Sequence, residues 1–301
     1  MNRHLILGIL GLVVLLFATL LAPVVSPYPL DYQENIIILE KESGREILYS
    51  PHPPSGRHPF GTDPYGYDLL TQILHGLKYT LAVSIIVSFL RILAGGLVGI
   101  PLGVLYGRKR ESLLLKGLVG IPVFLFLYFL LFRVSFNSPI SVSRLVILEI
   151  SLLTLFGAPG VVESLRSKSA AVMEREFIEA SHSCGAGKGH LILRHVLPHL
   201  REDFLLRFIT EILLVLSLLG QLAIFNIFVG PTVYTQDPPL FHSATHEIAG
   251  LVGQYRHYLT NSRWLIIFPL LTYLFILGTF SSLFKGLTSL LLKRMHAVKY
   301  I

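Results

Sequence analysis

The 301-residue chain is 52% hydrophobic and only 14% charged, and its formal net charge is +7. Soluble domains carry about 25% charged residues, so this composition excludes an ordinary soluble domain and favours a membrane protein. The basic residues lie between apolar stretches, which leaves no soluble basic domain to bind nucleic acid. The single cysteine, Cys184, cannot form an intramolecular disulfide and is expected to be an incidental small residue.

Apolar stretches of membrane-spanning length recur along the chain. A hydrocarbon core about 30 Å thick requires roughly 20 apolar residues of helix. The sequence predicts six spans, the third being the shortest: Leu5–Val25, Thr80–Tyr106, Leu118–Phe132, Ile140–Phe156, Phe204–Val229 and Trp264–Leu292. We therefore expect an all-α, polytopic membrane protein. The first span has no clean cleavage site in VVSPYPL, so residues 1–26 are predicted to be an anchor helix that is not removed as a signal peptide.

Basic residues are concentrated in alternate connections between these spans. Cytoplasmic connections of membrane proteins are enriched in Lys and Arg. We therefore expect the chain to lie in the cell membrane, with these connections and both termini in the cytoplasm. The basic residues are Arg3, then Arg108, Lys109, Arg110 and Lys116, then Arg166, Lys168, Arg175, Lys188, Arg194 and Arg201, and finally Lys293, Arg294 and Lys299.

Two polar segments are expected outside the membrane. Residues 27–78 are rich in proline and turn residues, which predicts irregular structure with short turns. Within this segment Asp68–Lys78 has helical spacing and should lead as a helix into the second span. Residues 230–263 combine PTVYTQDPP with a weaker helical stretch. The second span contains small residues that would allow close helix packing, namely Gly95, Gly96, Gly99 and Gly103.

Charged residues inside predicted spans are costly and indicate packing or pathway sites. Arg91 is one such residue. Arg207 and Glu211 are four residues apart, a spacing that suits an ion pair on one helix. Arg144 and Glu149 are five apart, so a direct pair is strained but feasible. Structural pairing and contact with a solute both remain open for these groups.

Histidines in the second outside segment raise the question of a metal site. His242, His246 and Glu247 form an H-x-x-x-H-E cluster, and two histidines four apart can share a helix face. The cluster lacks the HExxH pattern and a clear further ligand, so we expect no metal site in this chain.

The stretch GAGKG in residues 185–189 superficially resembles a phosphate-binding loop. Such a loop requires G-x-x-x-x-G-K-S/T after a strand, but the first glycine position is His182 and the hydroxyl position is Gly189. Residues 164–184 lack Pro and Gly, which predicts a helix before the glycines, and a second apolar pattern follows them. The sequence therefore predicts two short helices with a glycine corner, inside a polar segment over residues 158–203.

The corner carries a recognisable motif. Glu179-Ala180-Ser181, three residues, Gly185, nine residues and His195-Val196-Leu197-Pro198 resemble the EAA motif of ABC importer permeases, which reads E-A-A, three residues, G, nine residues, I-x-L-P. Ser181 replaces the second alanine and His195 replaces the isoleucine. A second resemblance is HPFGTDPYGYD before the second span, which is similar to the signature of the dipeptide and oligopeptide subfamily and supplies Gly61, Thr62, Asp63, Gly66 and Asp68; Tyr67 stands where arginine is usual.

These resemblances imply the fold and the function of a C-type subunit of a dipeptide or oligopeptide importer. The expected fold is the ABC importer type I permease fold, with a core over residues 79–301. Implied partners are a second permease subunit, two ATPase subunits, an extracytoplasmic solute-binding protein, the peptide substrate and membrane lipid. ATP and Mg²⁺ would reside in the ATPase subunits, so this chain would bind no cofactor and would not itself be an enzyme.

The resemblance also implies residue roles at the corner. Glu179 would make a polar or capping contact with the ATPase, Ala180 and Ser181 would allow close approach, and Gly185 would permit the turn. Leu197 and Pro198 complete the motif, and Pro198 would end the second helix before the fifth span.

Peptide import has three alternatives. Related permeases also import nickel or metal chelates. A permease relative kept as a membrane scaffold or sensor would move no solute. An intramembrane enzyme would require paired catalytic groups at matched depth, but the spans contain no Asp and essentially no His.

Overall fold

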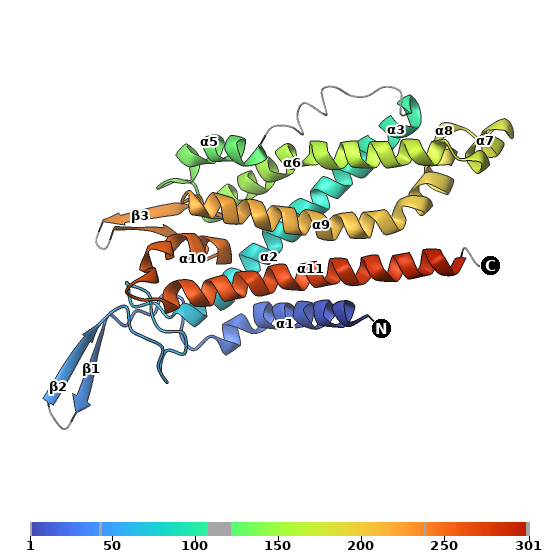
Figure 1. Cartoon of the computed structure of the whole chain (residues 1–301). Helices are drawn as coiled ribbons and strands as arrows, with labels where there is room; N and C mark the ends of the chain where they lie inside the picture. Colours follow the sequence, from blue (N-terminus) through green and yellow to red (C-terminus); the bar gives the residue numbers. More distant parts are fainter. Residues whose placement is uncertain (1, 42–43, 108–121, 237–238, 299–301) are drawn as a thin grey trace.

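The computed structural model describes residues 2–41, 44–107, 122–236 and 239–298. Long helices lie side by side in an elongated bundle (Figure 1). Within these described ranges, five continuous helical stretches are long and apolar enough to cross a membrane. The long helices are α1 (Arg3–Val25), α2 (Leu69–Ala94), α6 (Val142–Met173), α9 (Leu197–Ile224) and α11 (Trp264–Val298).

The predicted third span is represented by a shorter apolar helix, α5 (Val123–Ser135), which has 13 residues. The beginning of that span, residues 118–121, lies outside the described residues, as do the basic residues at 108–110, 116 and 299. The helical, multi-span membrane architecture is thus as predicted, and the number six stays a prediction.

The helix predicted to lead into the second span is present. α2 begins at Leu69, where the Asp68 carboxylate accepts a 2.8 Å hydrogen bond from the Thr71 backbone N–H. This side chain satisfies a donor that the first turn would otherwise leave free. α2 then continues through a wider π-helical turn, η1 (Gly95–Gly99), into α3 (Ile100–Tyr106).

The glycines of η1 and α3 allow this helix to lie directly against α6, as predicted. A Cβ added at Gly99 would lie 2.5 Å from the Val162 carbonyl oxygen, and one at Gly103 would lie 2.4 Å from the Arg166 carbonyl oxygen. Backbone approach this close requires the absence of a side chain. Gly96 points elsewhere, because its nearest neighbour, Phe204, would be 3.7 Å away.

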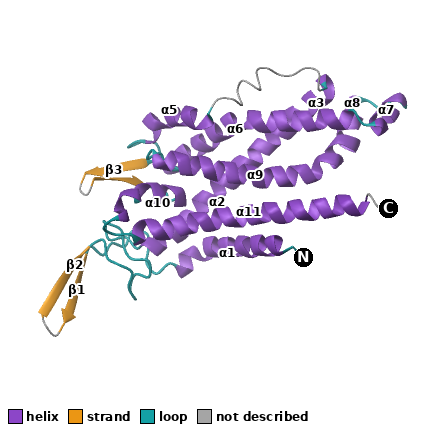
Figure 2. Ribbon diagram, viewed as in Figure 1, coloured by secondary structure: helices purple, strands orange, loops and turns teal. Residues whose placement is uncertain are grey.

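Two β-hairpins correct the expectation that the outside segments are irregular (Figure 2). In the first, β1 (Ile36–Lys41) pairs antiparallel with β2 (Gly44–Tyr49). In the second, β3 (Thr232–Gln236) pairs antiparallel with β4 (Pro239–Ser243). The segments IIILE and GREILY contain the β-branched and aromatic residues that are enriched in strands. A prediction based on the prolines and turn residues misses this signal.

The two ends of the bundle differ in structure. One end of the bundle, which we call the corner end, contains the start of α1, the end of α11 and two short helices, α7 (Glu176–Ser183) and α8 (Lys188–Leu191) (Figure 1). Both hairpins, α10 (Ile248–Gln254) and the 3₁₀ helix η3 (Arg256–Leu259) lie at the other, which we call the hairpin end. The bundle thus places the two predicted outside segments together.

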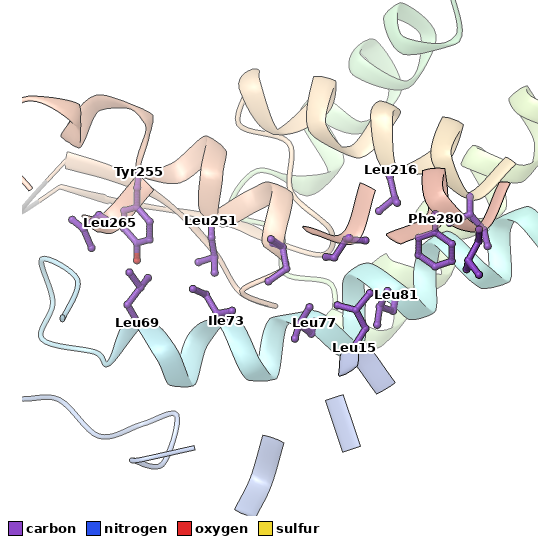
Figure 3. Close-up of a cluster of buried hydrophobic side chains, with 14 of the residues drawn as sticks. Leu15, Leu69, Ile73, Leu77, Leu81, Leu216, Leu251, Tyr255, Leu265 and Phe280 are labelled. Carbon is purple, nitrogen blue, oxygen red and sulfur yellow. The ribbon is translucent and has the colours of Figure 1, made fainter. Parts of the chain in front are cut away.

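Apolar side chains from α1, α2, α9, α10 and α11 form the largest core cluster. Figure 3 shows Leu69, Ile73 and Leu77 of α2 facing Leu251 and Tyr255 beside α11. α10 is therefore wedged among the long helices, so the segment between the fifth and sixth predicted spans is part of the core.

The contrast between Gly99 and Gly96 gives a test of this packing. Gly99→Ala should lower the free energy of unfolding by about 1–3 kcal/mol relative to Gly96→Ala, because overpacking against a backbone carbonyl forces a shift of that order. Thermal unfolding of the two purified variants in detergent measures the difference. Both changes add one methyl to a helical glycine, so equal melting temperatures would contradict the α3–α6 contact.

Candidate functional site: the glycine corner and the buried charged groups

A glycine corner joins α7 to α8, as predicted. Gly185 has φ of +88°, a left-handed conformation that costs most residues energy and glycine very little. A Cβ at Gly185 would meet nothing within 4 Å. Gly185 is therefore required by the backbone conformation of the corner and not by lack of space.

The corner is fixed to the bundle on one side and exposed on the other. On the inner side, buried apolar residues of α7, α8 and the π-helical turn η2 (Ile192–Val196) pack against α3, α6 and α9; this cluster includes Ile178, Leu191, Val196, Ile100, Leu165 and Leu200. On the outer side Glu179, Ala180, Cys184 and Gly185 are exposed. The corner therefore presents a rigidly supported protrusion with free polar and small residues.

The two residues that depart from the EAA pattern contact each other. Ser181 Oγ lies 3.3 Å from His195 Nε2, a contact between α7 and η2. The Phe177 ring also lies against His195, with ring centroids 6.1 Å apart. Replacement of the apolar pair by a hydroxyl and an imidazole thus keeps a direct contact across the corner.

Pro198 does not end a helix, contrary to the prediction. Helix runs from Lys188 to Ile224, and Pro198 lies in the first turn of α9. In η2 the Leu197 N–H bonds to the Ile192 carbonyl, five residues back, so the hydrogen-bond pattern is already widened where the proline's N–H is missing. α9 is consequently a rigid continuation of the corner.

At the hairpin end, the signature loop before α2 surrounds a buried carboxylate. Asp63 Oδ1 accepts from the backbone N–H groups of Tyr65 and Tyr67, both at 2.9 Å. Asp63 Oδ2 accepts from Gln72 Nε2 and from the Tyr255 hydroxyl, both at 3.0 Å. Burial raises the pKa of Asp63 to about 6, and these donors oppose that rise.

The other signature residues shape this loop. Gly61 and Gly66 have φ of +78° and +81°. Thr62 Oγ1 accepts from the His52 backbone N–H at 2.8 Å, and Asp68 both caps α2 and contacts His58 Nδ1 at 2.9 Å. Since Tyr255 belongs to residues 230–263, the Asp63–Tyr255 bond ties the two predicted outside segments together, a link that local sequence could not show.

His242, His246 and Glu247 do not converge on one point as metal ligands. His242 Nδ1 contacts Gln254 Nε2 at 3.1 Å, while Glu247 caps α10 by accepting from the Ala249 N–H at 2.9 Å. Burial lowers the pKa of His242 to about 4 and that of His246 to about 3, and it raises the pKa of Glu247 to about 7. Across the described ranges no group of three or more His, Cys, Asp or Glu is arranged to hold a metal.

Inside the bundle, Glu211 forms ion pairs with two arginines. Arg207 Nη2 lies 3.0 Å from Glu211 Oε1, which is the pair that the four-residue spacing predicted. Arg91 Nη1 lies 3.0 Å from Glu211 Oε2, and Arg91 also donates to the Leu153 carbonyl oxygen at 2.7 and 3.1 Å. Arg91 therefore joins α2, α6 and α9, whereas the sequence suggested no partner for it.

Glu149 has partners other than Arg144. Its carboxylate accepts from the Gly230 N–H at 2.8 Å and lies 3.4 Å from Ser135 Oγ, while the Arg144 side chain is exposed. Residues five apart lie about 140° apart around an α-helix, which explains why the direct pair does not form.

Comparison with known proteins places this architecture in a family. Residues 95–297, more than half of the chain, match the family described as binding-protein-dependent transport system inner membrane component. The chain belongs to this family.

Curated relatives of the family carry transport names. A Brucella abortus protein named as a peptide permease protein is 30% identical over 201 residues, 66% of this chain and 60% of the relative. A Brucella suis protein named as a peptide transport system permease protein is 26% identical over 263 residues, 86% of this chain and 78% of the relative. The oligopeptide transport system permease protein OppC of Haemophilus influenzae is 30% identical over 145 residues, 48% of this chain and 44% of the relative.

The family match covers the corner and α9 but begins after Arg91 and the Asp63 loop. Together with the five membrane-length helices it makes the chain an integral membrane protein.

The elevated pKa of Glu247 predicts a pH dependence of stability. Because the folded pKa of about 7 exceeds the ordinary 4.5, the stabilising contribution is full below about 4.5 and is lost as the pH rises through about 7. His242 and His246, whose folded pKa values lie below the ordinary 6.5, make stability rise with pH up to about 6.5, but wild type and a Glu247→Gln variant share this contribution. Relative to Glu247→Gln, which can still cap α10, wild type should therefore lose melting temperature between about pH 5 and pH 7 and lose no more above about pH 8; parallel curves for wild type and variant would contradict it.

Proposed function

We propose that this chain is a permease subunit of an ATP-driven importer of peptides, and that the glycine corner receives the movement of an ATPase subunit. The observation that carries the proposal is the exposed corner between α7 and α8, which is fixed to the bundle and lies within the family match. The peptide substrate is supported by the names of the relatives. We assign the chain to the C-type subunits on the same resemblance to peptide permeases.

Energy would come from partner subunits. The GAGKG segment lacks the first glycine and the Ser or Thr of a phosphate-binding loop, so we assign ATP and Mg²⁺ to two ATPase subunits and no cofactor to this chain. Glu179 and the small residues Ala180 and Ser181 would then face a groove on an ATPase. A second permease subunit would complete the pathway, and a solute-binding protein would deliver the peptide at the hairpin end.

The orientation follows from charge. Arg175, Lys188 and Arg194 lie around the corner, and the start of α1 and the end of α11 lie at the same end of the bundle. Placing this basic end in the cytoplasm satisfies the charge bias of membrane proteins. The corner then meets cytoplasmic ATPases, and the hairpins face the outside of the cell membrane.

A mechanical route from the corner into the membrane is supported by helix continuity. Helix runs without a break from Lys188 through η2 into α9, which carries Arg207 and Glu211. A displacement of α8 would therefore move the inner part of α9 as a unit. Closure of the ATPases would favour one of two arrangements of the bundle, which is how differential contacts drive a transport cycle.

The proposal is tested by ATP hydrolysis of the purified complex in lipid. We expect stimulation only when the solute-binding protein and a mixed peptide pool are both present. A complex that contains no ATPase subunit would overturn the permease assignment. An ATPase rate unaffected by peptides, with no peptide uptake, would overturn the peptide assignment.

Gly185→Val should uncouple hydrolysis from transport. Valine disfavours the φ of +88°, at a cost of about 1–3 kcal/mol, so the corner should change shape. We expect peptide uptake to fall at least tenfold with basal ATP hydrolysis and protein level retained, both measured in the same vesicles.

Gly189→Ala is the matched control for this variant. Gly189 lies in α8, and an added Cβ there would also meet nothing within 4 Å. This control should transport normally. Normal transport by Gly185→Val would contradict the role of the corner.

A further inference from the structure

A cavity lies beside Arg91 and Arg207, among α2, α6, α9 and Val123, the first residue of α5. Its volume is about 260 Å³, and its walls include Arg91, Arg207, Glu211, Ser217 and Gln221. These α9 residues lie along one side of the helix. The cavity therefore brings charged and amide groups together at a depth where apolar residues are expected.

The charges on the cavity wall are unbalanced. Two guanidinium groups share the single carboxylate of Glu211. Arg91 also donates to the Leu153 carbonyl oxygen, whereas within the described residues neither Arg207 Nε, a buried atom, nor Glu211 Oε1 makes a hydrogen bond. The Arg207 side chain is 28% exposed, compared with 3% for Arg91. One positive charge in excess of the carboxylate therefore borders the cavity.

Glycines on α6 leave space for this arrangement. A Cβ at Gly157 would lie 2.0 Å from Arg91 Cζ, so only glycine admits the guanidinium there. A Cβ at Gly160, also on the cavity wall, would meet nothing within 4 Å. The α6 side of the cavity is thus in close contact with Arg91 at Gly157 and leaves open space at Gly160.

Polar residues on α9 connect this cavity with a second one nearer the hairpin end. Ser217 and Gln221 line both cavities and are exposed, and Gln221 Nε2 donates to Ser217 Oγ at 3.3 Å. The second cavity, of about 480 Å³, is also lined by Arg256. A hydroxyl and an amide facing lipid would be costly, so this side of α9 is better suited to a passage that holds water and solute.

We propose that the cavity beside Arg207 is a station in the solute pathway that receives the C-terminal carboxylate of a peptide. This inference rests on the proposed function and specifies which part of the peptide is recognised. Arginine binds a carboxylate through charge-assisted hydrogen bonds, and the Arg207 side chain, 28% exposed at the cavity wall, presents a guanidinium in excess of the single carboxylate. Glu211, shared with Arg91, keeps the guanidinium in place while the peptide passes.

Access and binding are tested first without transport. In a Cys184→Ser background, Ser217→Cys in the assembled complex should react with a water-soluble maleimide. A tripeptide library with free C-terminal carboxylates should slow this reaction, and the same library with C-terminal amides should not. Lack of reaction would show that this side of α9 faces lipid, and equal effects of both libraries would remove the carboxylate preference.

The role of Arg207 is then tested by substitution. Arg207→Gln should abolish the protection by the free-acid library and lower uptake of that library roughly tenfold, as expected for loss of a hydrogen bond to a charged group. Uptake of the amidated library, normalised to the amount held by the solute-binding protein, should change little. Arg207→Lys should retain part of the free-acid preference because it keeps the charge.

Matched controls separate the possible causes of failure. Arg144→Gln makes the same chemical change at an exposed arginine of α6 and should leave both libraries unaffected. If wild type transports neither library, the proposed function fails. If wild type transports peptides and Arg207→Gln affects both libraries equally, only the carboxylate station fails.

The lipid composition provides a final control. The experiments are repeated in vesicles of neutral phosphatidylcholine and in vesicles containing an anionic lipid. An effect of Arg207→Gln that depends on the anionic lipid and not on the peptide terminus would overturn the proposal, because the guanidinium would then bind a lipid phosphate.

Discussion

The ion pairs of Glu211 with Arg91 and Arg207 hold the centre of the bundle together. The Glu211 carboxylate forms ion pairs with Arg91 of α2 and with Arg207 of its own helix, and Arg91 in turn donates to the Leu153 carbonyl of α6. Arg91 and Glu211 are both buried, so removal of one would leave the charge of the other poorly compensated. Gly157 is needed at the same place because any side chain there would overlap the Arg91 guanidinium. The position of α6 against α2 and α9 is therefore set by a polar cluster as well as by apolar packing.

The two ends of the bundle are organised by different means. At the hairpin end, Asp63 gathers donors from its own loop, from α2 and from Tyr255, so the two outside segments behave as one unit. At the corner end, an apolar cluster supports α7 and α8 from below and leaves their outer face free. A closed polar network suits a fixed outer structure, whereas a supported but exposed protrusion suits contact with a moving partner. The proposed function assigns solute entry to the first end and the ATPase contact to the second.

α9 connects these regions. The widened turn at Ile192–Val196 lets the helix pass Pro198 without interruption, so α8 and the inner part of α9 form one rod. The same helix then carries Arg207, Glu211, Ser217 and Gln221 along the cavities. In the proposed mechanism, one rigid element would link the corner to the charged groups that face the solute. The Ser181–His195 contact lies at the start of this route and keeps α7 against η2 despite two departures from the usual motif.

The sequence by itself determined the features that depend on neighbours along the chain. Apolar run length predicted the membrane helices, helical spacing predicted α2 and the Arg207–Glu211 pair, and the glycines predicted both the corner and the close packing of α3 on α6. The tertiary structure decided which distant groups meet: Arg91 with Glu211, Tyr255 with Asp63, and Glu149 with Gly230 in place of Arg144. Spacing along one helix fixes which residues share a face, but the partner across a helix boundary depends on how the helices pack. The continuation of helix past Pro198 could not be predicted for a related reason, because a widened helical turn accommodates the proline, whereas the strand signal of β1 and β2 was present in the local sequence.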